Sequence, residues 1–129
     1  MVIVEVIFMD TSGVKEVLQM YFDGCAGGDA EKIAKVFHDG SHVYGLSENG
    51  KILDSDKDAF VKIIGSFKPD GQTPRQDEIL SIDFTGENTA VARVKIRVGN
   101  ILFTDILSFI QLEGKWGVIS KVYSGVPAE

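Results

Sequence analysis

Apolar residues recur with helical spacing in three segments of the first half of the chain. The pattern predicts a first helix from about Ser12 that ends at Gly27-Gly28. Asp29 suits the N-cap of a short second helix that ends at Asp39-Gly40, and Asp56 suits the N-cap of a third that ends at Pro69-Asp70-Gly71. The inward positions are Val14, Val17, Leu18, Tyr21, Phe22 and Cys25 in the first helix, Ile33, Val36 and Phe37 in the second, and Phe60, Ile63, Ile64 and Phe67 in the third.

The second half of the chain alternates between apolar and polar residues. This alternation predicts four strands, at about 76–85, 89–98, 101–112 and 115–124, after two short strands at 42–46 and 51–53. Residues 1–9 are rich in β-branched side chains and predict an extended segment, with a helical continuation into the next element as the alternative. Three helices followed by a long meander predict one α+β domain over residues 1–129, with the helices packed on one face of the sheet.

Turn positions fix the register of the predicted meander. A two-residue turn at Gly99-Asn100 places Val94 opposite Asp105, and a turn at Glu113-Gly114 pairs Phe109 with Val118, Leu107 with Ser120 and Asp105 with Val122. We expect a loop with an odd number of residues at 86–88, because it places the apolar side chains of the first long strand on the same face as those of the other strands. One face is then apolar with Asp105 near its centre: Leu80, Ile82, Phe84, Ala90, Ala92, Val94, Ile96, Phe103, Leu107, Phe109, Trp116, Val118 and Val122.

The opposite face of the sheet mixes basic and apolar residues. It carries Arg93, Lys95, Arg97 and Lys121, interleaved with Leu102, Ile106, Ile110, Ile119 and Tyr123. This mixture is too apolar for a surface that meets bulk water. The sequence therefore predicts a homodimer in which a second copy of the chain covers part of the outer sheet face.

Composition narrows the possible partners. The chain has 129 residues and a net charge of −6, which opposes non-specific attraction to nucleic acid or anionic membranes. Cys25 is the only cysteine, so no intrachain disulfide is possible. No segment approaches the ~20 apolar residues of a membrane helix, and the apolar run Val2–Met9, interrupted by Glu5, lacks the basic region of a signal peptide. We therefore expect a cytoplasmic protein that binds neither membrane nor nucleic acid.

Asp105 is the residue most suggestive of chemistry. A carboxylate among hydrocarbon side chains must be paired, be protonated or face a wet cavity, and a buried acid with a raised pKa suits general acid–base catalysis. The alternative is a structural hydrogen bond to a helix backbone, to Ser120 or to a tyrosine. His42 is the candidate catalytic partner, and a surface or structural role is the alternative.

Several aromatic residues are candidates to line a pocket. Tyr21, Tyr44 and Trp116 combine an apolar body with a polar tip, and they suit the core equally well. Cys25 is expected to pack inertly on the first helix. His38 and His42 have a metal-ligand spacing, but a break lies between them and no third ligand is evident, so neither a metal nor a cofactor is expected. Motifs for phosphate-binding loops and serine hydrolases are missing from the sequence.

The order of these motifs resembles the nuclear transport factor 2-like superfamily. The resemblance rests on Tyr21-Phe22-Asp23-Gly24, Gly28-Asp29-Ala30 through Val36-Phe37-His38, Phe103-Thr104-Asp105, and Lys115-Trp116 through Lys121-Val122-Tyr123. Within the superfamily the chain is most similar to the small proteins called putative lumazine-binding. The resemblance implies a cone-shaped fold, with three N-terminal helices on a strongly curved, mostly antiparallel sheet, a pocket at the open end and dimerisation through the outer face. The superfamily includes ketosteroid isomerase, scytalone dehydratase, SnoaL-like polyketide cyclases and non-catalytic binding domains, so the fold does not select a reaction.

Three functions follow as hypotheses. The leading one is a small-molecule-binding domain for an apolar or aromatic ligand, held by residues from several elements and oriented by Asp105. The second is a cofactor-independent isomerase, dehydratase or cyclase that uses Asp105 with His42 or Tyr44. The third is a dimeric interaction module with a filled core. The expected ligand-binding residues are Tyr21, Phe37, Tyr44, Phe60, Phe103 and Trp116.

Overall fold

The computed structural model describes residues 9–129, which form three helices and one six-stranded sheet. The elements follow the order α1 (Ser12–Gly27), α2 (Ala30–Val36), β1 (Phe37–Leu46), β2 (Ile52–Asp56), α3 (Lys57–Ser66), β3 (Asp77–Gly86), β4 (Thr89–Val98), β5 (Ile101–Leu112) and β6 (Lys115–Pro127). The α+β class is confirmed, although the hairpin β1–β2 separates α3 from the first two helices. The predicted extended segment at the N-terminus lies almost entirely outside the described residues.

The helix starts follow the predicted capping residues. The Asp29 side chain accepts a hydrogen bond of 3.1 Å from the Lys32 backbone, and Asp56 accepts one of 2.9 Å from the Ala59 backbone. Helix α2 is shorter than predicted, because the chain becomes extended at Phe37 and pairs there with Val118 of β6. His38, which directly precedes the predicted helix end at Asp39-Gly40, therefore lies on a strand.

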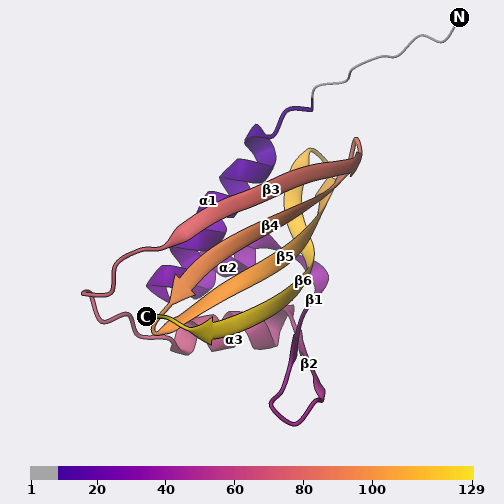
Figure 1. The fold of residues 1–129 in the computed structure, drawn as a ribbon. Helices are drawn as coiled ribbons and strands as arrows, with labels where there is room; N and C mark the ends of the chain where they lie inside the picture. The colour runs from indigo at the N-terminus through magenta and orange to yellow at the C-terminus, as the bar shows by residue number, and fades with distance from the viewer. Residues whose placement is uncertain (1–8) are drawn as a thin grey trace, which may run out of the picture.

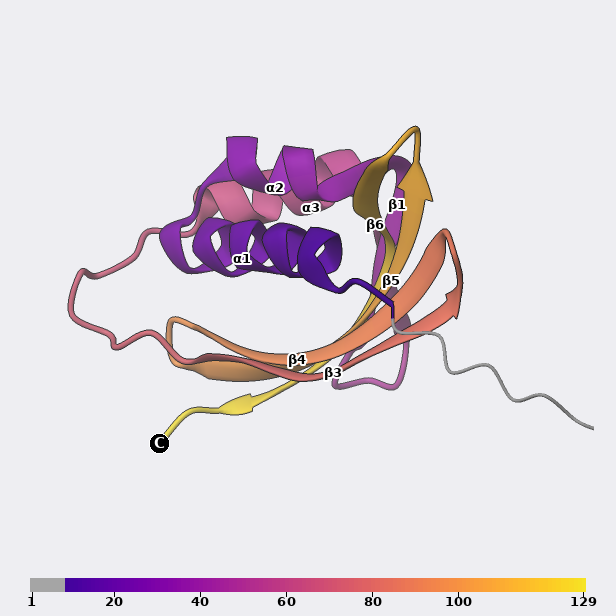
Figure 2. The same cartoon turned by 90° about the horizontal axis from the view of Figure 1, so that it is seen from above.

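The sheet has the strand order β2-β1-β6-β5-β4-β3. Strands β1 and β6 are parallel, and the other neighbours are antiparallel. The predicted pairing of β4 with β5 is confirmed, with Val98 opposite Ile101 and Val94 opposite Asp105. All three helices lie on one side of the sheet, which bends around α1 (Figures 1 and 2).

A β-bulge in β6 corrects the predicted register. Phe109 pairs with Val118 as expected, but the register shifts at the next pair, so that Leu107 faces Lys121 and Asp105 faces Tyr123. One extra residue on one strand reverses which side chains face inward beyond it. Lys121 and Tyr123, predicted on the outer face, therefore point toward the helices, and Val122, predicted inside, is 49% exposed.

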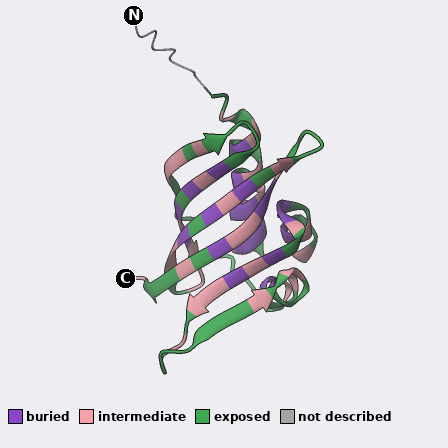
Figure 3. Ribbon diagram, turned by 90° about the vertical axis from the view of Figure 1, so that its right-hand side faces the viewer, coloured by how far each residue is buried: buried purple, intermediate pink, exposed green. Residues whose placement is uncertain are grey.

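The core lies between the three helices and the concave face of the sheet. Buried and exposed positions alternate along the strands, as Figure 3 shows for the sheet. Ile82 and Phe84 pack against this core as predicted, whereas an irregularity at Leu80 brings Asp77 opposite Ile96. Within residues 9–129, no helix combines the length and the hydropathy required to cross a membrane.

Candidate functional site

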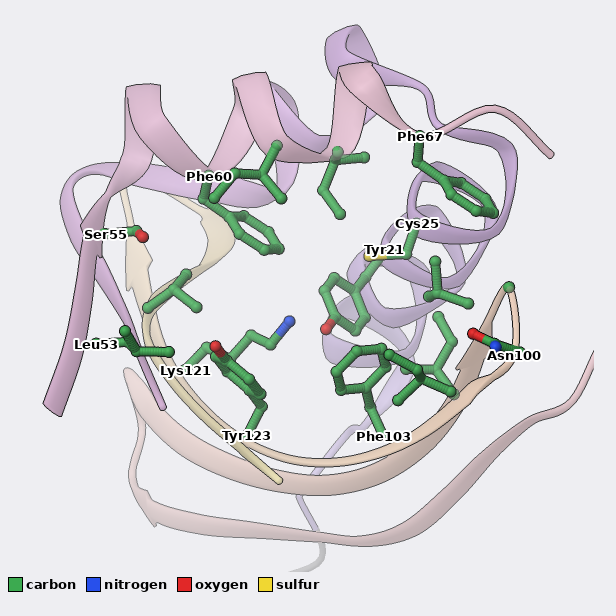
Figure 4. Close-up of a pocket in the computed structure, with 17 residues that line it drawn as sticks. Tyr21, Cys25, Leu53, Ser55, Phe60, Phe67, Asn100, Phe103, Lys121 and Tyr123 are labelled. Carbon is green, nitrogen blue, oxygen red and sulfur yellow. The ribbon is translucent and has the colours of Figure 1, made fainter. Parts of the chain in front are cut away.

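A cavity of about 380 Å³ lies between α1, α3 and the concave face of the sheet (Figure 4). Helix α1 contributes Tyr21 and Cys25, and α3 contributes Phe60 with two isoleucines. The hairpin between β4 and β5 and the loop after α3 supply further apolar walls. Among the described residues that line the cavity, Lys121 alone carries a charge. The site is thus a hydrocarbon pocket with one cationic point.

Asp105 lies directly behind this lining. Its side chain is fully buried on β5, and its Oδ2 accepts a hydrogen bond of 2.5 Å from the Tyr21 hydroxyl. The Lys121 Nζ is 3.9 Å from the same oxygen, and Oδ1 has no hydrogen-bond partner among residues 9–129. Burial raises the pKa of Asp105, and the charge of Lys121 and the Tyr21 hydrogen bond offset part of that rise. Asp105 itself does not line the cavity, but the two side chains that it contacts, Tyr21 and Lys121, do.

Lys121 reaches the cavity from the inner face of β6. Its side chain is 8% exposed, and its Nζ lies 4.5 Å from the centroid of the Phe60 ring. The same atom lies 5.3 Å from the Tyr21 ring and 5.4 Å from the Tyr123 ring. Figure 4 shows the amine pointing into the space bounded by these rings. Attraction to the aromatic faces offsets part of the cost of removing the ammonium from water.

Tyr21 and Cys25 keep their protons in this environment. Burial, followed by the charge of Asp105, raises the pKa of Tyr21 well above its ordinary value, so its hydroxyl remains a donor. Burial raises the pKa of the Cys25 thiol to about 11. A thiol with this pKa is a poor nucleophile near neutral pH, which agrees with the packing role expected for Cys25.

Comparison with known proteins places the chain in a family. Residues 9–124 match the family described as "Putative lumazine-binding". The chain belongs to this family. None of the curated proteins matches this chain significantly.

Solved structures of similar proteins share the fold. An NTF2-like protein of unknown function from Shewanella baltica has 26% identity and a TM-score of 0.82, covering 90% of this chain and 93% of its own. A second from Methylobacillus flagellatus has 27% identity and a TM-score of 0.77, with 88% and 90% covered. A ketosteroid isomerase-like protein from Erwinia carotovora has 12% identity and a TM-score of 0.72, with 92% and 98% covered, and shows likeness of fold alone. The chain thus has the nuclear transport factor 2-like fold.

Four of the six predicted ligand-binding residues lie in the cavity wall or directly behind it, and two lie elsewhere. Tyr21, Phe60 and Phe103 line the cavity. Phe37 is buried behind two of them, with ring centroids 5.2 Å from Phe60 and 6.2 Å from Tyr21. The other two predicted residues lie elsewhere. Tyr44 borders a separate surface depression with Val122, and Trp116 packs against Phe84 with centroids 5.8 Å apart.

His42 does not meet Asp105, which corrects the predicted catalytic pair. Its Nδ1 lies 2.6 Å from Oδ1 of Asp54 on β2, and its side chain is 40% exposed. The reason is the alternation of β1: Val43 points inward to the cavity, so the neighbouring His42 points outward. His38 is also engaged elsewhere, with Nε2 2.7 Å from the Ile110 carbonyl oxygen.

Lys121 and Tyr123 are site residues that sequence reasoning placed on the wrong face of the sheet. Strict alternation from the Glu113-Gly114 turn assigns both to the outer face, and the bulge reverses them. Two adjacent apolar residues, Val118 and Ile119, interrupt the alternation of β6 at this point. A phase change there is compatible with a bulge, but adjacent apolar residues also occur in strands with two covered faces.

Proposed function

We propose that this chain is a small-molecule-binding domain whose ligand has an apolar, ring-containing body. The observation that carries the proposal is the apolar cavity of about 380 Å³ with one polar cluster, in which Tyr21 and Lys121 line the wall and Asp105 lies directly behind them. Ligand sites are concave, mostly apolar and about 300–1,000 Å³ in volume, with a few polar groups that fix orientation. Asp105 orients the ligand indirectly, by holding the Tyr21 hydroxyl and by attracting Lys121.

The family description supports a planar ligand. Lumazine is a fused heteroaromatic ring, and the rings of Phe60, Phe103 and Tyr123 offer flat apolar walls to a molecule of that shape. A purely structural module with a filled core is less compatible with a cavity of this size.

A neutral fluorescent probe tests the proposal. N-phenyl-1-naphthylamine emits strongly only in apolar surroundings, so we expect saturable fluorescence with the wild-type protein. Ile101→Trp enlarges a residue that lines the cavity and should weaken the binding. Leu112→Trp is the control, because Leu112 is an exposed aliphatic residue of the same strand, far along β5 from the cavity. Absence of binding, or equal binding by both variants, would contradict the proposal.

A second candidate is a cofactor-independent acid–base enzyme. It is favoured by one contact, the Tyr21–Asp105 hydrogen bond, which links a buried acid of raised pKa to a hydroxyl in the cavity wall. Because Asp105 is fully buried, a proton would pass to a substrate through Tyr21. Asp105→Asn distinguishes the two functions: an enzyme loses turnover while probe binding persists, whereas a binding domain has no turnover to lose.

The outer sheet face is proposed to pair with a second copy of the chain. Ile106 on β5 is 46% exposed and lies opposite Val122 on β6, which is 49% exposed. Two aliphatic residues side by side in the middle of an uncovered sheet face favour burial against a partner. Because a two-fold interface brings the same patch together from both subunits, this apolar strip meets itself.

A further inference from the structure

The ammonium group of Lys121 lacks a hydrogen-bond acceptor within residues 9–129. Its side chain is 8% exposed, and its nearest oppositely charged atom, Oδ2 of Asp105, is 3.9 Å away, which is too long for a hydrogen bond. An ammonium that is largely shielded from bulk water requires either a close anion or several acceptors, since a charge with little hydration and no partner is costly. The protein supplies the cation but leaves its acceptors incomplete.

Asp105 does not complete this coordination. Its Oδ2 is already held by the Tyr21 hydroxyl at 2.5 Å, and its Oδ1 makes no hydrogen bond to a described residue. Burial also favours the protonated form of Asp105, which leaves the charge of Lys121 less compensated. Asp105 and Lys121 therefore attract each other electrostatically, but no hydrogen bond joins them.

Three aromatic rings lie around the Lys121 ammonium, but they provide no acceptor of opposite charge. Phe60, Tyr21 and Tyr123 each present a ring within 5.4 Å of Nζ, and none of them supplies an anion. The amine points into the cavity (Figure 4), where no other described lining residue is charged. The missing acceptor must come from whatever occupies the cavity.

We propose that the natural ligand is an organic anion, an apolar ring system bearing one carboxylate or comparably acidic oxygen that binds Lys121 Nζ. The inference rests on the proposed binding function and names its ligand class. An anionic oxygen at this point forms charge-assisted hydrogen bonds with the ammonium, while the ring body fills the apolar space toward Phe103.

Matched competitors test the ligand class. Bound N-phenyl-1-naphthylamine is displaced with 2-naphthoate or with 2-naphthamide, which share ring and shape and differ in charge. We expect 2-naphthoate to bind the wild-type protein at least about tenfold more tightly, the effect of one hydrogen bond to a charged group. Lys121→Met should abolish that preference and retain the neutral probe. Lys121→Arg should preserve the preference, as should Lys115→Met, which changes the net charge equally at the exposed start of β6.

The outcomes separate the two proposals. If the neutral probe does not bind wild type, the binding function fails and the ligand class fails with it. If the probe binds but naphthoate and naphthamide compete equally, only the ligand class is overturned. The wild-type comparison decides this even if Lys121→Met does not fold.

Discussion

The Tyr21 hydroxyl donates a hydrogen bond of 2.5 Å to Asp105, which is 84 residues away in the sequence. Both side chains are fully buried, so the bond joins helix α1 to the middle of β5 without competition from water. Because Tyr21 also lines the cavity, the contact that anchors the helix shapes the proposed site. Stability and ligand orientation therefore depend on the same pair.

Replacing Tyr21 with phenylalanine should destabilise the protein. The change leaves both carboxyl oxygens of Asp105 without a hydrogen bond from the described residues, and an unsatisfied buried polar group costs about 1–3 kcal/mol. Denaturant unfolding monitored by circular dichroism measures the loss. Tyr44→Phe is the control, because Tyr44 is half-buried on the outer face of β1, and it should change stability by less than about 0.5 kcal/mol. Equal losses for the two variants would contradict this role of the Tyr21 hydroxyl.

Gly28 is required at the turn between α1 and α2. It has φ 62°, and a Cβ at this position would overlap the Phe67 carbonyl oxygen at the end of α3. Gly28→Ala should therefore lower the free energy of unfolding by about 1–3 kcal/mol, through left-handed strain and steric overlap. Gly27→Ala is the matched control one residue earlier, since a Cβ there meets no atom within 4 Å. A melting temperature unchanged in Gly28→Ala would refute the argument.

Cys25 should be unreactive while the protein is folded. Its thiol is 1% exposed and has a pKa of about 11, so little thiolate forms at pH 8 and reagents have little access to it. Iodoacetamide should modify it slowly in buffer and fully in denaturant, as followed by intact mass. Rapid labelling of the folded protein, suppressed by a cavity-binding probe, would instead indicate that the thiol is open to the cavity.

Much of the fold could be predicted because its signals are local. Asp29 and Asp56 cap helices within three residues of themselves, and the two-residue turn at Gly99-Asn100 sets the entire β4–β5 register. The family match and similar structures confirm the nuclear transport factor 2-like resemblance. Features that depend on a few neighbouring residues were therefore visible in the sequence.

The composition of the site was harder to predict because it depends on one irregular residue. The bulge at Ile119 moves Lys121 from the outer face to the cavity. The alternation of apolar and polar residues does not predict where such an extra residue is inserted. His42 was misplaced for a related reason. The register between β1 and β6 shifts between Phe37 and His42, and the pairing beyond that shift places Val43, not His42, on the inner face. Tertiary pairing decides both positions.

The proposed dimer predicts a concentration-dependent mass. Sedimentation at micromolar concentration should give twice the mass of one chain, and Ile106→Glu should give the monomer, because a carboxylate in an apolar interface is left without a partner. Glu78→Gln is a control at an exposed position on β3, away from the strip formed by Ile106 and Val122. A wild-type monomer at this concentration would rule out the dimer, and the cavity of one chain would be unaffected.

Asp105 should give stability an unusual dependence on pH. Its native pKa is raised above the ordinary value of 3.8, so between 3.8 and the native pKa the folded state binds more protons than the unfolded state. Stability from this group is therefore complete below 3.8 and falls as pH rises through the native pKa. Asp105→Asn keeps an acceptor for Tyr21 and removes the titration, so the variant should gain stability relative to wild type between pH 4 and 8.

Asp70→Asn provides the opposite case for the same measurement. Hydrogen bonds from Thr73 and Gln72 lower the pKa of Asp70 to about 2, so its contribution is complete above 3.8 and disappears only as pH falls toward 2. The difference between Asp70→Asn and wild type should thus be constant from pH 4 to 8. Urea unfolding of the three proteins across this range measures both differences. If the difference in unfolding free energy between Asp105→Asn and wild type is also constant from pH 4 to 8, the pKa of Asp105 is not raised, because the substitution removes only a titration outside this range.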